Sequence, residues 1–166
     1  MLNIILGNAL CFVGMGTDSI SAARKTSKAM LLWQILSQLI YAISSLLLGA
    51  YSAAVQNLAN VLRNWFAIGS KPSRIVEGFL IVFAVVFGLI FNNLGIWGLI
   101  PVISTLQYSL VVFFRKDNAQ LLRISFAAAM VMFIVFNAYI LNIGGVIANA
   151  VVLVSTIISY LKERKQ

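Results

Sequence analysis

Long apolar stretches follow one another along the chain, separated by short polar gaps. A helix that spans a bilayer needs about 20 mainly apolar residues, with a range of about 17 to 25. Because several stretches meet this requirement, the pattern predicts an all-α, polytopic membrane protein with seven transmembrane helices. They run approximately over residues 3–21, 29–48, 51–68, 75–91, 96–114, 121–141 and 144–161.

The polar gaps are of two alternating kinds. Every second gap is basic, whereas the gaps between them (49–51, 92–95 and 142–145) carry no charge. Basic loops stay on the cytoplasmic side during insertion. The alternation therefore predicts a cytoplasmic C-terminus and, with seven spans, an N-terminus outside. The basic clusters are Arg24-Lys25-Lys28, Lys71-Arg74, Arg115-Lys116-Arg123 and Lys162-Arg164-Lys165.

The composition agrees with a membrane protein. Of the 166 residues, 61% are hydrophobic and 10% are charged, and the mean hydropathy is +0.99. A soluble domain of this size cannot bury so much apolar surface, so the chain is expected in a membrane. The net charge of +8 lies at the ends of apolar runs. This placement favours contacts with anionic lipid headgroups and argues against nucleic acid as a partner.

The residue types limit the chemistry of the protein. The chain has no histidine and a single cysteine, Cys11, and no pair of acids falls inside a predicted span. An activated nucleophile with its base is therefore not expected. We predict no enzymatic activity, no cofactor and no metal site.

Weak internal repetition divides the seven spans. Gly7 recurs as Gly98 and Arg24-Lys25 as Arg115-Lys116, both at a spacing of 91, while Asn57 recurs as Asn149 at 92. This spacing fits two three-helix bundles, residues 1–70 and 96–166, joined by a linker helix, residues 71–95. Because a single linker span restores the direction of the chain, the two repeats are expected to be parallel within one compact membrane domain.

The order Gly7, Arg24-Lys25-Thr26-Ser27-Lys28, Tyr41, Leu48-Gly49-Ala50-Tyr51 and Asn57 resembles the PQ-loop or MtN3 superfamily, which includes the SWEET sugar transporters. Residues 46–51, 60–63 and 99–103 look most like the YgjV-type bacterial inner-membrane proteins. The resemblance implies a transporter built from parallel repeats. SWEET-like proteins carry a Pro-Gln pair, of which only Gln107 is present here, and a pocket tryptophan, which is replaced by Tyr41 and Phe133. These departures weaken the expectation that the transported solute is a sugar.

Polar side chains inside the spans are the best indicators of a pathway. Asn57 and Asn149 occupy equivalent places near mid-depth, and we predict that they bind solute together with Tyr41, Phe133, Gln38 and Asn60. An alternative is that the asparagines only hydrogen-bond neighbouring helices, worth about 1 kcal/mol each, and that the aromatic rings only pack.

Arg63, Pro101 and Gln107 are candidates for a gate. Arg63 follows Asn60 by one turn, and extension of its side chain toward the lipid headgroups is the favoured alternative. Pro101 and Gln107 are candidates for a hinge and a latch, because proline removes a backbone hydrogen bond.

Asp18 is expected to pair with Arg24, Lys25 or Lys28, which favours a facilitator over a proton-coupled pump.

Taken together, the residues predict a transporter or facilitator of a small neutral polar solute that is sugar-like, nucleoside-like or vitamin-like. The site would be exposed to each side in turn as the two bundles move. The alternative is a non-transporting receptor or a subunit of a larger membrane complex.

Overall fold

The computed structural model describes residues 1–69, 73–115 and 117–164, which form helices and no strand. Lys71, Lys116 and Lys165 of the predicted basic clusters lie outside the described residues. The helices are α1 (Leu2–Ala22), α2 (Ser27–Leu47), α3 (Tyr51–Ile68), α4 (Arg74–Ile90), the short 3-10 helix η1 (Gly95–Gly98), α5 (Leu99–Arg115), α6 (Ala119–Tyr139) and α7 (Ile143–Arg164).

Each predicted span coincides with one α-helix, to within a few residues at either end. In the described part of the chain, five helical segments are both long and apolar enough to cross a membrane: α1, α2, η1 with α5, α6, and α7. α4 has only 17 residues. α3 has 18 residues, but Gln56, Asn57, Asn60, Arg63 and Asn64 lower its hydropathy. These five side chains are all buried, so the polarity of α3 faces the protein interior and not lipid.

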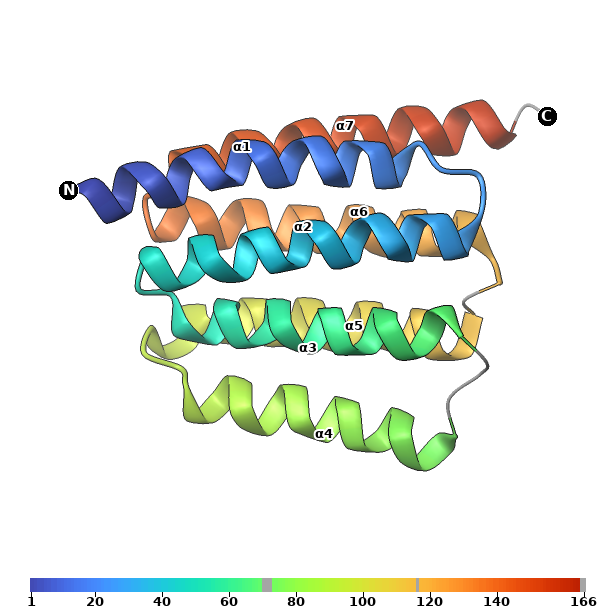
Figure 1. The fold of residues 1–166 in the computed structure, drawn as a ribbon, viewed down its shortest axis with the longest axis horizontal. Helices are drawn as coiled ribbons and strands as arrows, with labels where there is room; N and C mark the ends of the chain where they lie inside the picture. Colours follow the sequence, from blue (N-terminus) through green and yellow to red (C-terminus); the bar gives the residue numbers. More distant parts are fainter. Residues whose placement is uncertain (70–72, 116, 165–166) are drawn as a thin grey trace.

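The helices form two layers (Figure 1). One layer contains α1, α2 and α3 in that order, and the other contains α7, α6 and α5, so that α1 packs on α7 and α3 packs on α5. α4 lies at one side of the sandwich and packs on both α3 and α5. Consecutive helices run antiparallel, and α1, α3, α5 and α7 all point the same way.

The two ends of the bundle differ in charge. The C-terminal ends of α1, α3, α5 and α7 lie at one end of the bundle, while the N-terminus and the C-terminal ends of α2, α4 and α6 lie at the other (Figure 1). The basic residues Arg24, Lys25 and Arg115 lie at or directly after the ends of α1 and α5 in the first group. We call these the basic end and the uncharged end. At the basic end, Thr26, Ser73 and Asn118 cap the first turns of α2, α4 and α6 by accepting a backbone N–H hydrogen bond.

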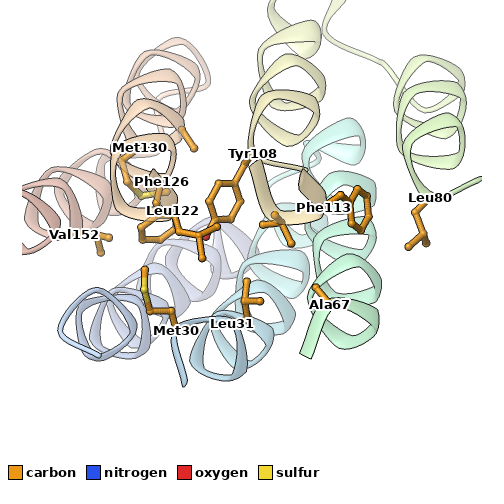
Figure 2. Packing of buried hydrophobic residues seen from close by; sticks show 12 residues of the cluster. Met30, Leu31, Ala67, Leu80, Tyr108, Phe113, Leu122, Phe126, Met130 and Val152 are labelled. Atoms are coloured by element: carbon orange, nitrogen blue, oxygen red, sulfur yellow. The ribbon is translucent and has the colours of Figure 1, made fainter. Parts of the chain in front are cut away.

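An apolar core joins the layers in the half of the bundle nearer the basic end. Met30 and Leu31 of α2 meet Tyr108 of α5 and Phe126 of α6, whose ring centroids lie 5.7 Å apart (Figure 2). The other buried members of this cluster include Ala67, Leu80, Val112, Phe113, Leu122, Ala129, Met130 and Val152. Because these side chains come from both layers, they separate the middle of the bundle from the basic end.

Candidate functional site

A small cavity lies between the two layers, toward the uncharged end from the apolar core. Its volume is about 40 Å³, enough for roughly three water molecules. A sugar or nucleoside therefore does not fit in this conformation unless the layers move apart. The lining residues come from both layers and are Cys11, Asp18, Gln38, Tyr41, Ser45, Ala53, Asn57, Met130, Phe133, Phe136, Asn137, Asn142 and Asn149.

The structure brings most of the predicted solute-binding residues to this cavity. Asn57, Asn149, Tyr41, Phe133 and Gln38 all line it, although they come from four different helices. Asn60 does not line it. Its Nδ2 instead donates to Oε1 of Gln38 at 3.3 Å, so Asn60 supports one wall of the cavity from behind.

The two asparagines present acceptors to the cavity. Nδ2 of Asn149 donates to the backbone carbonyl of Gly145 at 2.8 Å, and Nδ2 of Asn57 donates to Oγ of Ser45 at 3.3 Å. A carbonyl oxygen only accepts hydrogen bonds, which fixes the orientation of the Asn149 amide. Each amide uses one N–H in these bonds, so its Oδ1 acceptor and a second N–H remain for a bound molecule.

Asp18 departs from the prediction. It was expected to pair with Arg24, Lys25 or Lys28, but it is fully buried and lines the cavity. Its Oδ1 accepts a hydrogen bond from Ser37, the middle residue of α2, while Oδ2 has no hydrogen-bond partner among the described residues. The prediction rested on the position of Asp18 near the end of α1 in the sequence. In the structure, this part of α1 packs beside the middle of α2, so Asp18 is buried there.

Arg63 is also buried, with 2% of its surface exposed, so extension toward the headgroups was the wrong alternative. Its guanidinium donates to Oδ1 of Asn60 at 2.7 Å, to Oδ1 of Asn64 at 2.8 Å and to Oγ of Ser109 at 3.2 Å. It also lies over the ring of Tyr108, 4.6 Å from the centroid. Neutral dipoles and one aromatic ring thus replace the water that the charge would lose in lipid.

A polar network connects Arg63 to the cavity wall through α2. Gln34 accepts from Asn64 at 3.3 Å and exchanges hydrogen bonds with the hydroxyl of Tyr108 at 3.0 to 3.1 Å. The hydroxyl of Ser37 lies within hydrogen-bond distance of both the backbone carbonyl of Gln34 and Oδ1 of Asp18, and it donates its single proton to one of them at a time. The buried acid and the buried guanidinium are therefore joined by neutral groups and do not form an ion pair.

Pro101 and Gln107 occupy places that limit their predicted gating roles. Pro101 is the third residue of α5, directly after η1, where a proline removes no hydrogen bond within the α-helix. Gln107 exchanges hydrogen bonds with Ser125, donating to its backbone carbonyl at 2.9 Å and accepting from its hydroxyl at 2.8 Å. Gln107 therefore joins α5 to α6 within one layer.

Polar contacts cross from α1 to the α6–α7 turn next to the cavity. Nδ2 of Asn142 donates to Oδ1 of Asn137 at 2.7 Å, and Asn142 also contacts the thiol of Cys11. The thiol in turn lies 3.2 Å from the hydroxyl of Ser44 on α2. These contacts hold α1, α2 and the α6–α7 turn together at the uncharged end of the cavity.

At the basic end, Arg123 joins the layers. Its side chain is fully buried and binds both carboxylate oxygens of Glu163 at 2.6 Å. It also donates to the backbone carbonyls of Ala22 at 3.3 Å and Arg24 at 2.6 Å. One side chain of α6 thus binds α7 and the α1–α2 connection. We call this cluster the basic-end clasp.

Sequence reasoning missed Asp18, Ser45, Asn137 and the basic-end clasp. A helical spacing of three to four residues places Asp18 on the same face of α1 as the small residues Gly7, Cys11 and Gly14, all of them buried. The repeat spacing of 92 that links Asn57 to Asn149 also links Ser45 to Asn137. Nothing in the sequence distinguishes Arg123 from the other basic residues of its cluster.

Comparison with known proteins assigns this chain to a family. No curated protein and no solved structure matches the chain. Residues 5–166 match the model of the Imp-YgjV family, described as a bacterial inner membrane protein. This match covers nearly the whole chain and agrees with its several long apolar helices. The chain therefore belongs to the Imp-YgjV family of multi-pass bacterial inner membrane proteins.

Proposed function

We propose that this protein is a transporter or facilitator that carries a small polar solute across the inner membrane by alternating access. The observation that supports this most is the cavity between the layers, with Asn57 from one layer and Asn149 from the other in its wall. Polar groups buried at membrane depth are costly and are found where they line a pathway or bind one another.

The two layers would be the moving parts, and they would correspond to the two repeats of a 3+1+3 arrangement. In this arrangement, a two-fold axis along the membrane normal would exchange α1 with α5 and α3 with α7. The packing of α1 on α7 and of α3 on α5 supports it, because such an axis would relate these two contacts. Four pairs of cavity residues are also spaced by 92 positions: Gln38 and Met130, Tyr41 and Phe133, Ser45 and Asn137, Asn57 and Asn149. α4 would be the linker span. Equivalent positions of two parallel repeats thus supply most of the wall, as expected of a repeat-built transporter.

In this proposal the basic end faces the cytoplasm, with the C-terminus inside and the N-terminus outside. The apolar core and the basic-end clasp lie between the cavity and that end. The conformation would therefore be closed toward the cytoplasm. Release of Glu163 from Arg123 would accompany opening on that side.

Flux measurements on purified protein in liposomes test the proposal. A panel of small polar solutes, neutral and charged, is offered to the wild type, to Asn57→Ala with Asn149→Ala, and to the control Asn3→Ala. Asn3 is exposed and lies in the first turn of α1, away from the cavity. We expect flux of at least one solute that the double variant loses and the control keeps.

Two results would contradict a transport role. One is the absence of flux for the whole panel with a correctly folded protein. The other is a stoichiometric membrane partner recovered by crosslinking, together with an unchanged cell phenotype in the double asparagine variant, which would favour the receptor or subunit alternative.

A further inference from the structure

The cavity holds one acid, and its position defines the chemistry of the site. Among the residues that line the cavity, Asp18 is the only acidic one, and no basic residue lines it. Asp18 is fully buried, and its Oδ2 atom has no partner at normal hydrogen-bond distance among the described residues, although the hydroxyl of Tyr41, which also lacks such a partner, lies near the carboxyl group. A buried carboxylate without a partner is strongly unfavourable, so a cationic group at this place would be stabilising.

The remaining wall presents further acceptors and aromatic rings. The Oδ1 atoms of Asn57 and Asn149 are further acceptors, and each amide nitrogen keeps one N–H beside the bond that it already donates. Tyr41 and Phe133 each contribute a ring from opposite layers. A carboxylate, amide oxygens and aromatic rings are the groups that recognise ammonium ions, through charge-assisted hydrogen bonds and cation–π contacts.

The protein does not supply the counter-charge to Asp18 by direct contact. The ion pairs formed by described residues are Arg74–Glu77 and Arg123–Glu163, and neither includes Asp18. The guanidinium of Arg63 is directed to Asn60, Asn64 and Ser109. It balances the charge of Asp18 only from a distance, through Gln34 and Ser37.

We propose that the cavity binds a small organic ammonium group, with Asp18 as the counter-ion. This inference rests on the proposed function and specifies its solute class, replacing the neutral solute that two asparagines alone suggest. The volume of about 40 Å³ admits an ammonium head with a small substituent in this conformation. A larger amine would enter with its head at Asp18 and would need the layers to separate.

Equilibrium binding tests the inference directly. Radiolabelled methylammonium is offered to the full-length protein in nanodiscs at neutral pH, with methanol, sodium ions and guanidinium as competitors. We expect saturable binding that methanol and sodium do not displace. Asp18→Asn should weaken it by at least about thirtyfold, the loss typical when one partner of a buried charge pair is removed.

Asp117→Asn is the matched control, because it removes the same charge from an exposed position outside the helices. Its affinity should equal that of the wild type. Absence of methylammonium binding to the wild type, equal affinity in Asp18→Asn, or displacement by sodium would overturn the inference.

A second measurement avoids dependence on the folding of Asp18→Asn. Cys11 lines the same cavity and is the only cysteine of the chain. A thiosulfonate reagent bearing an ammonium group should modify Cys11 of the wild type faster than a neutral reagent of similar size. The matched reference is a cysteine in place of Asn93, which is exposed in the α4–η1 connection, in a Cys11→Ser background. It should show no such preference. The inference would be contradicted if the ratio of the modification rates with the ammonium reagent and the neutral reagent were equal at the two positions. It would also be contradicted if neither reagent modified Cys11.

Binding and transport fail separately in these experiments. Methylammonium bound through Asp18 without flux in liposomes would leave the ammonium site intact and contradict the proposed facilitator. Flux of a neutral solute that is retained in Asp18→Asn would support the transport role and contradict the ammonium site.

Discussion

The Arg123 guanidinium on α6 binds both carboxylate oxygens of Glu163 on α7 at 2.6 Å, and the same guanidinium binds the backbone of the α1–α2 connection. The two partners differ in environment. The Arg123 side chain is fully buried, whereas 24% of the Glu163 side chain is exposed. Loss of the Glu163 carboxylate would therefore leave the positive charge of Arg123 in the interior. Loss of the Arg123 guanidinium would leave the negative charge of Glu163, which is partly exposed.

Glu163→Gln should destabilise the protein because it leaves the Arg123 charge buried without a counter-ion. Removal of one partner of a buried ion pair costs about 3 kcal/mol or more. Unfolding by denaturant in bicelles measures the change in free energy. The exposed acid Asp117, changed to Asn, is the control and should shift it little. A Glu163→Gln protein as stable as this control would show that the clasp adds no net stability.

Gly14→Ala should disturb the cavity, because a Cβ at this position would lie 2.6 Å from the ring of Tyr41. The ring must then move into the cavity or α1 must shift, and overpacking of this kind costs about 1 to 3 kcal/mol. Gly16→Ala is the matched control, since no neighbouring atom lies within 4 Å of its added Cβ. Thermal unfolding in detergent distinguishes the two variants, and equal melting temperatures would contradict the tight packing of Tyr41 on α1.

Arg63→Lys keeps the charge and tests the geometry of the polar network. A lysine ammonium cannot reach Asn60, Asn64 and Ser109 together and does not stack on Tyr108 as a planar guanidinium does. Since each hydrogen bond to a charged group contributes about 1.5 to 3 kcal/mol, we expect a clear loss of stability. Arg115→Lys at the exposed end of α5 should be silent in the same unfolding measurement. If both changes are silent, Arg63 is not held by this network.

The orientation of the bundle can be checked with single cysteines in a Cys11→Ser background. Ala23 in the α1–α2 connection and Asn93 in the α4–η1 connection are both exposed, at opposite ends. A membrane-impermeant thiol reagent applied to intact cells, with the outer membrane made permeable, should label Asn93→Cys and not Ala23→Cys. The reverse pattern would place the basic end outside.

The helices were predictable because a span is defined by local composition, and the alternating basic gaps also indicated which connections share an end. The repeat spacing indicated the partner of Asn57, and five of the six predicted solute-binding residues line one cavity. The interior positions of Asp18 and Arg63 were not predictable in this way. Sequence distance to a helix end suggested access to the headgroups, but tertiary packing sets depth, and here neighbouring helices extend past both residues.

The separate burial of Asp18 and Arg63 has an electrical consequence. When Asp18 is ionised, the opposite charges of Asp18 and Arg63 sum to zero, as do those of Arg123 and Glu163, so rearrangement of the layers without a solute would move no net charge across the membrane. A bound ammonium would add one positive charge to the same movement. Transfer of one charge through a potential of 100 mV corresponds to about 2.3 kcal/mol. Solute flux through such a protein would be driven by the membrane voltage, inward in a cell with a negative interior.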